Sequence, residues 1–100
     1  MPDVFALARR CGVRVEYADL GPWGPCELRS EYDPAGPAIR INTRVLGLMP
    51  PDEAQRMAEL AVAHELYHHR EARGEVARLT NSHERERAAD AFARDLVERR

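Results

Sequence analysis

Between Asp52 and Arg73 the chain contains neither proline nor glycine, and this uninterrupted stretch constrains the fold more than any other feature. Proline and glycine interrupt helices most strongly, and apolar side chains recur here along one stripe, so the stretch predicts a long helix. Asp52 is a suitable N-cap, and Gly74 is a suitable end for the helix. The stripe comprises Met57, Leu60, Ala61, His64 and His68.

A helix is also expected towards each end of the chain. The N-terminal one covers Pro2–Arg10, opens with a proline and an aspartate, and ends before Gly12. The C-terminal one begins at Asn81 or Ser82, where Glu84 completes a capping box with Asn81. The side chains that this helix is expected to bury are Ala89, Phe92, Ala93, Leu96 and Val97.

Three strands are expected between the first two helices, because side chains there alternate with period two. They cover Val13–Tyr17, Cys26–Tyr32 and Ala38–Asn42, and the last two form an antiparallel hairpin around the turn at Asp33–Pro37. A helix, three strands and two long helices predict an α+β fold with a small three-stranded antiparallel or mixed sheet. In this prediction residues 1–100 form a single domain with a modest core.

Composition and charge exclude several classes of function. Lys+Arg 15 against Asp+Glu 17 leaves a formal net charge of −2, so no basic excess favours direct nucleic-acid binding. No apolar run approaches the ~20 residues of a membrane span, and Met1–Asp3 does not resemble the start of a signal peptide. Cys11 and Cys26 form neither a disulfide framework nor a metal motif, which favours free thiols in a reducing compartment. We therefore expect a cytoplasmic protein without membrane contact.

The residues His64-Glu65-Leu66-Tyr67-His68 form an HExxH motif in the middle of the long predicted helix. Residues four apart share one face of a helix, so both imidazoles can reach one tetrahedral Zn²⁺ ion. Glu65, about 100° further round the helix, is placed to act as a general base on water. A solvated helix face that happens to carry two histidines and a glutamate is the alternative explanation.

Zinc held by two histidines needs a third protein ligand, and acidic residues downstream can supply it. The metzincin pattern requires glycine at position 71 and histidine at 74, where this chain has Glu71 and Gly74, so that class is excluded. Glu86 and Asp90 lie four apart on the last predicted helix and share a face. One of them can bind the metal while the other accepts a hydrogen bond from the outer nitrogen of a ligating histidine.

This arrangement resembles that of the gluzincin metallopeptidases, in which HExxH is followed by E-x-x-x-D on the next helix. The segment Glu86–Ala93 is similar to the E-x-x-A-N/D-x-F-A signature of the ImmA/IrrE metallopeptidase family, and the strand ending in I-x-I-N is also similar. The resemblance implies a minimal, single-domain zincin-like fold with one Zn²⁺ per chain. The site residues that it implies are the zinc ligands His64, His68 and Glu86, the base Glu65 and the orienting carboxylate Asp90.

Other side chains near the motif are less strongly indicated as site residues. His69 lies about 100° round the helix from the second motif histidine and is expected at the surface or behind a ligand. His83 and Tyr67 are candidates for stabilising the transition state, with a place in the first helical turn and simple packing as the respective alternatives. Glu84 competes for the third-ligand role but lacks an acidic partner four residues on. Trp23, flanked by Gly-Pro steps, fits either a core position or a cleft wall.

These features together predict a zinc-dependent metalloendopeptidase, in which Glu65 activates water for attack on a peptide carbonyl. The strand Ala38–Asn42 is expected to form the rim of the cleft and to pair with an extended substrate. The substrate is a peptide or protein, and the resemblance implies a transcriptional regulator as one candidate; the oligomeric state is left open. Two alternatives are a zinc-stabilised regulatory or binding module with little turnover, and a toxin–antitoxin or phage-type component that acts through protein contacts.

Overall fold

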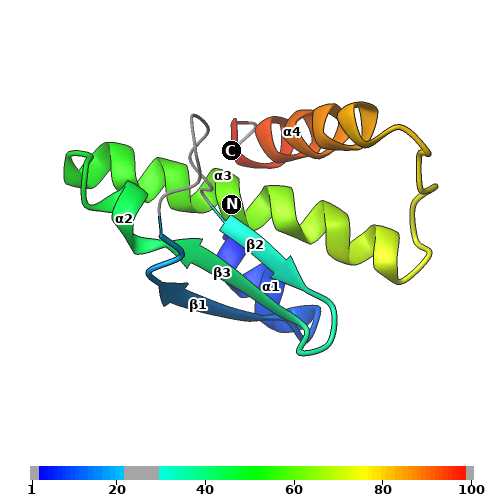
Figure 1. Ribbon diagram of the computed structural model, residues 1–100, viewed down its shortest axis with the longest axis horizontal. Coiled ribbons are helices and arrows are strands. Elements are labelled where there is room, and N and C mark those ends of the chain that lie inside the picture. Colours follow the sequence, from blue (N-terminus) through cyan, green and yellow to red (C-terminus); the bar gives the residue numbers. More distant parts are fainter. Residues whose placement is uncertain (1–2, 22–29, 99–100) are drawn as a thin grey trace.

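The computed structural model describes residues 3–21 and 30–98, and it confirms the predicted α+β class. In chain order the elements are α1 (Val4–Arg10), β1 (Arg14–Ala18), β2 (Ser30–Asp33), β3 (Ala38–Asn42), α2 (Thr43–Leu46), α3 (Pro51–Ala72) and α4 (Ser82–Glu98) (Figure 1). The short helix α2 is not among the predicted elements. Trp23, Cys26 and the first part of the predicted strand Cys26–Tyr32 lie outside the described residues.

The strand β3 lies at the centre of the sheet, in the order β1-β3-β2. It pairs in parallel with β1 and antiparallel with β2, so the predicted hairpin is present and the sheet is mixed. The expectation that Ala38–Asn42 forms the rim of a cleft and pairs with a substrate is wrong, because both edges of this strand are already hydrogen-bonded. The edge strands are β1 and β2.

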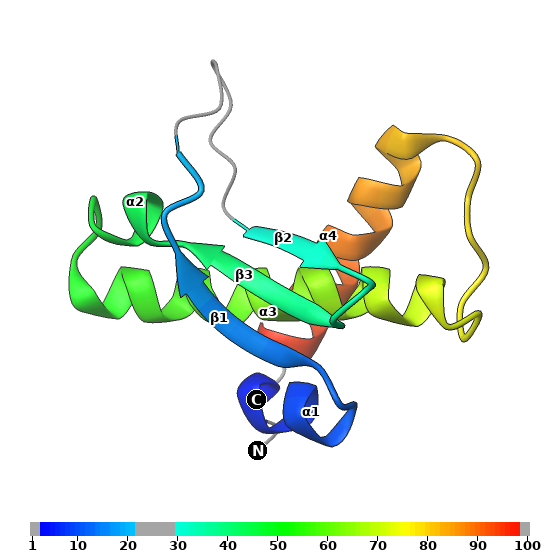
Figure 2. The ribbon, with the colours of Figure 1, turned by 60° about the horizontal axis from the view of Figure 1, so that its bottom comes forward.

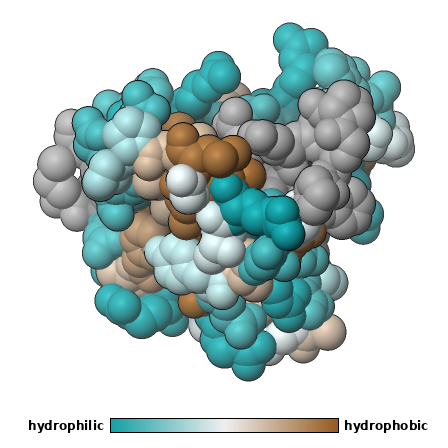
Figure 3. All heavy atoms as spheres, turned by 60° about the vertical axis from the view of Figure 1, so that its left-hand side comes forward, coloured by the Kyte–Doolittle hydropathy of each residue, from teal (hydrophilic) through white to brown (hydrophobic). Residues whose placement is uncertain are grey.

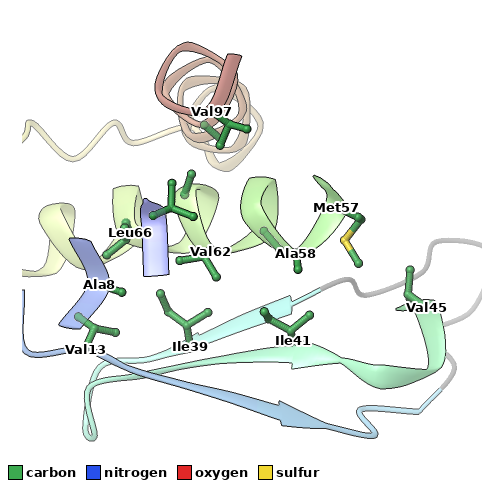
Figure 4. Close-up of a cluster of buried hydrophobic side chains, with 14 residues drawn as sticks. Ala8, Val13, Ile39, Ile41, Val45, Met57, Ala58, Val62, Leu66 and Val97 are labelled. Carbon is green, nitrogen blue, oxygen red and sulfur yellow. The ribbon is translucent and has the colours of Figure 1, made fainter. Parts of the chain in front are cut away.

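The long helix α3 lies between the sheet and α4, and apolar side chains fill both interfaces (Figure 4). Ile39 and Ile41 project from β3 towards Val62 of α3, and Val97 of α4 reaches the core from the other side of α3. The helix α1 packs against α3 and β1 (Figure 2). Burying each of these aliphatic side chains stabilises the fold by about 1.5–3 kcal/mol relative to exposure. Burial on two sides thereby fixes the position of α3, which carries the HExxH motif.

The helix ends follow the predicted chemistry except at the start of α3. Asn81 caps α4, since its Oδ1 accepts hydrogen bonds from the backbone N–H groups of His83 and Glu84 at 2.9 and 3.2 Å. The predicted N-cap Asp52 instead lies in the first turn of α3, which begins at Pro51. Proline suits the first helical position because its fixed φ is already helical and the N–H it lacks has no partner there.

No helix in the described ranges is long and apolar enough to span a bilayer. Apolar atoms do reach the surface at the α2 side of the molecule, where Figure 3 shows them gathered among hydrophilic ones. Leu48, in the turn after α2, is 77% exposed, and Tyr17 on β1 is 56% exposed. Tyr17 lies on β1, which is an edge strand of the sheet.

Candidate metal centre

The middle of α3 presents His64 and His68 on the face that meets α4. One helical turn separates these residues, and their ring centroids lie 5.0 Å apart. Leu66 lies between the two histidines in sequence and Val62 lies just before them, and both are buried in the core. Their burial sets the rotation of the helix about its axis, so the two imidazoles face away from the main core and towards α4.

Glu86, on α4, lies between the two imidazoles. Its Oε1 atom is 3.0 Å from Nε2 of His64, and its Oε2 atom is 3.0 Å from Nε2 of His68. The buried Ala89 and Ala93 further along α4 have small side chains, which allow this helix to lie close to α3. The structure therefore brings together the three side chains that the resemblance implies as ligands.

A second carboxylate lies behind each histidine, at its Nδ1 atom. Asp90 Oδ1 is 2.8 Å from Nδ1 of His64, which is the contact expected from its spacing. Glu71 Oε1 is 2.7 Å from Nδ1 of His68, a contact that was not predicted from the sequence. The signal for it was present in the spacing, because an acid three residues after a histidine shares its helix face.

Glu71 also joins the two helices of the site. Arg85 donates two hydrogen bonds to its carboxylate, from Nε to Oε2 and from Nη2 to Oε1, both at 3.1 Å. These charged hydrogen bonds lower the pKa of the buried Glu71 carboxyl despite its burial. Arg85 directly precedes Glu86 in the chain. Its two hydrogen bonds to Glu71 therefore hold the first part of α4 against α3, next to His68.

The two histidines have fewer N–H groups than the carboxylates that face their ring nitrogens, and this shortage favours a cation between them. Each imidazole faces a carboxylate at both of its nitrogens, which makes four close N···O contacts. A neutral imidazole has only one N–H, so an Nδ1–H donated to Asp90 or Glu71 leaves the Nε2 lone pair facing an oxygen of Glu86. Two such acceptors repel each other unless a proton or a metal ion lies between them. Two imidazole nitrogens and a carboxylate form the kind of donor set that Zn²⁺ accepts.

Glu65 is buried beside the histidines and is held by the sheet. The Ser30 hydroxyl of β2 donates a hydrogen bond of 2.7 Å to Glu65 Oε2. Burial raises the pKa of the Glu65 carboxyl, and the Ser30 hydrogen bond partly opposes that shift. One donor atom from each of His64, Glu65 and His68 lies within 4.8 Å of the others. A carboxyl in this position, with a raised pKa, suits a group that takes up and releases protons.

A pocket of about 340 Å³ opens next to these groups. From α3 its lining includes Glu65 of the candidate metal centre, and Met57, Leu60 and Ala61 extend the lining towards the start of the helix. Ser30 of β2 and several residues of α4 complete the lining. The pocket therefore joins the polar groups of the site to an apolar surface that is suited to a side chain of a ligand.

The remaining candidates lie outside this cluster. Tyr67 packs against the rings of His68 and Phe92, which agrees with packing as the alternative to a role in the transition state. His83 lies in the first turn of α4, is exposed, and its backbone N–H is bonded to the cap. His69 is buried beneath the sheet, with its Nδ1 atom 2.7 Å from the Tyr32 hydroxyl. Of the two places expected for it, at the surface or behind a ligand, the surface is therefore wrong. Sheet residues face it because it lies on the side of α3 that is turned away from α4.

Comparison with models of known protein families, with curated proteins and with solved structures finds no match for this chain.

Proposed function

We propose that this protein is a zinc-dependent metalloendopeptidase of the gluzincin type, with His64, His68 and Glu86 as ligands of one Zn²⁺. The observation that carries the proposal is the set of four N···O contacts, which place Glu86 against both Nε2 atoms and a carboxylate behind both Nδ1 atoms. An orienting carboxylate on the outer nitrogen of a ligating histidine is typical of zinc sites.

The roles of the chain's own residues follow from their positions. Zn²⁺ in such a site acts as a Lewis acid that polarises a peptide carbonyl and makes water more acidic. Glu65 takes a proton from the attacking water and passes it to the leaving amine, and the hydroxyl of Ser30 holds its carboxylate in place for both steps. The apolar part of the 340 Å³ pocket accommodates a side chain of the bound peptide.

An open pocket beside the ligands supports turnover over a closed, purely structural zinc site, in which four protein ligands fill the coordination sphere. The resemblance to the ImmA/IrrE family adds a transcriptional regulator as a substrate to the proposal. A cytoplasmic location is a further part, and it rests on the two cysteines, which form no disulfide framework.

The test replaces the base and leaves the ligands in place. We expect Glu65→Gln to bind zinc with unchanged stoichiometry and to lose hydrolysis of a fluorogenic peptide library by more than about 10²-fold. Glu53→Gln, in the exposed first turn of the same helix, is the matched control and should retain activity. Zinc-loaded wild type that cleaves no peptide, or Glu65→Gln that cleaves as well as wild type, would contradict the proposal.

A further inference from the structure

The edge of β1 carries backbone groups that point away from the sheet. Arg14 donates its N–H to the Pro37 carbonyl at 3.2 Å, which directs its backbone groups towards β3. Backbone groups alternate in direction along a strand, so those of Val15 and Tyr17 point outwards. An edge of this kind is a template for pairing with another strand.

The side chains of β1 divide between the two faces of the sheet. Tyr17 is level with the buried Ile41 of β3, which places it on the helix-covered face together with Val15, yet it is 56% exposed. Arg14 and Glu16 lie on the opposite face, where Glu16 forms an ion pair of 3.6 Å with Arg40.

A hollow of about 630 Å³ lies along this edge. It is lined by Phe5 and Arg9 of α1, by Val13 just before β1, and by β1 residues that include Val15 and Tyr17. The surface of the hollow is largely apolar, although Arg9, Arg14 and Glu16 also line it. An apolar wall with charged groups at its side suits an aromatic ring with a hydroxyl group.

We propose that β1 pairs antiparallel with β1 of a second copy of this chain, about a two-fold axis at Val15. In that register Val15 lies opposite its own copy, and the two exchange backbone hydrogen bonds. Arg14 faces Glu16 of the second copy, and Glu16 faces Arg14, so both charged pairs are of opposite sign.

The same register explains the exposed tyrosine. Tyr17 of each copy lies opposite Val13 of the other, on the helix-covered face, and enters the hollow beside Phe5 and Arg9. The two three-stranded sheets become one sheet of six strands in the order β2-β3-β1-β1-β3-β2. The contact is small, so the dimer is in equilibrium with the monomer and its population depends on concentration.

The pairing leaves the metal centre accessible. Ser30, which bonds to Glu65, belongs to β2 at the opposite edge of each sheet. The proposed dimer therefore does not depend on the proposed peptidase activity. A protein that does not dimerise would bind zinc and hydrolyse peptides as before.

The charged pairs allow a direct test by analytical ultracentrifugation between about 10 and 500 µM. Wild type should approach twice its 11.3 kDa mass as concentration rises. Arg14→Glu places glutamate opposite glutamate, and Glu16→Arg places arginine opposite arginine, so each variant alone should associate at least about tenfold more weakly. An equimolar mixture of the two restores opposite charges at both positions and should form a heterodimer.

Folding of each variant is verified by its thermal unfolding midpoint and by zinc stoichiometry, since neither residue contacts the metal centre. Wild type that stays monomeric at the highest concentration would overturn the proposal. So would single variants that dimerise like wild type, or a mixture that stays monomeric while wild type dimerises. Tyr17→Ala offers a second measure, because emptying the hollow should also weaken the dimer while the charges stay unchanged.

Discussion

The two histidines of the motif share a helix face, but the carboxylates behind them are held in different ways. Asp90, behind His64, belongs to α4, and its side chain is 58% exposed. Glu71, behind His68, belongs to α3 itself, is 2% exposed, and receives two hydrogen bonds from Arg85. The carboxylate behind His68 therefore comes from the same helix and is held there by Arg85 of α4, whereas the carboxylate behind His64 comes from α4 and is mostly exposed. Both sides of the site depend on the packing of α4 against α3, but only the His68 side is shielded from solvent.

Removing Glu86 should produce the largest effect, because this residue faces both histidines. We expect Glu86→Ala to weaken zinc binding by more than the ~10–100-fold typical of an orienting residue, as measured by competition with a chromogenic chelator. The melting temperature of wild type should fall when a chelator removes the metal, whereas that of the variant should not respond. Equal zinc affinity in both proteins would rule out Glu86 as a ligand.

Glu71→Ala should affect both metal binding and stability. Arg85 loses two charged hydrogen bonds to a buried carboxylate, so the free energy of unfolding should drop by about 1–3 kcal/mol in chemical denaturation of the metal-free protein. Zinc affinity should fall by about 10–100-fold because His68 loses its orienting partner. Glu75→Ala is the control, since the ion pairs of Glu75 with Arg70 and Arg73, just after the end of α3, are exposed. A Glu71 variant that behaves like the Glu75 variant would refute this role.

Asp90→Ala should lower zinc affinity and leave the stability of the metal-free protein almost unchanged. We expect a similar ~10–100-fold loss of zinc affinity but a change of less than ~0.5 kcal/mol in unfolding of the metal-free protein, because this aspartate is mostly exposed. Asp95→Ala, on another face of α4, serves as the control for zinc affinity. If Asp90→Ala and Asp95→Ala leave zinc affinity equally unchanged, Asp90 does not orient His64.

Helical periodicity accounts for the part of the site that could be predicted. The spacing of His64 and His68, and that of Glu86 and Asp90, places each pair on one helix face before any tertiary structure is known. The stop at Gly74 then makes two helices that can lie side by side, and the structure brings these four side chains into contact.

The contacts that could not be predicted depend on pairing between distant segments. Nothing local in Ala38–Asn42 shows that it lies between two other strands, because the parallel pairing with β1 is decided by packing on α3. The hydrogen bond from Ser30 to Glu65 depends on that same sheet order. The sequence does not distinguish Arg85 from the other arginines, because its role depends on the burial of Glu71 next to it.

The spacing of the site along the chain has a consequence for the order in which it assembles during folding. Glu86 is 22 residues from His64, whereas Ser30 is 35 residues from Glu65 and reaches it only when the sheet has formed. Local helical contacts form faster than non-local strand pairing, because less chain entropy is lost in closing them. We expect the helical hairpin to bring the proposed ligands together early and the sheet to enclose Glu65 later. Under the proposed function, a newly made chain would then be able to bind zinc before the proposed base is in place.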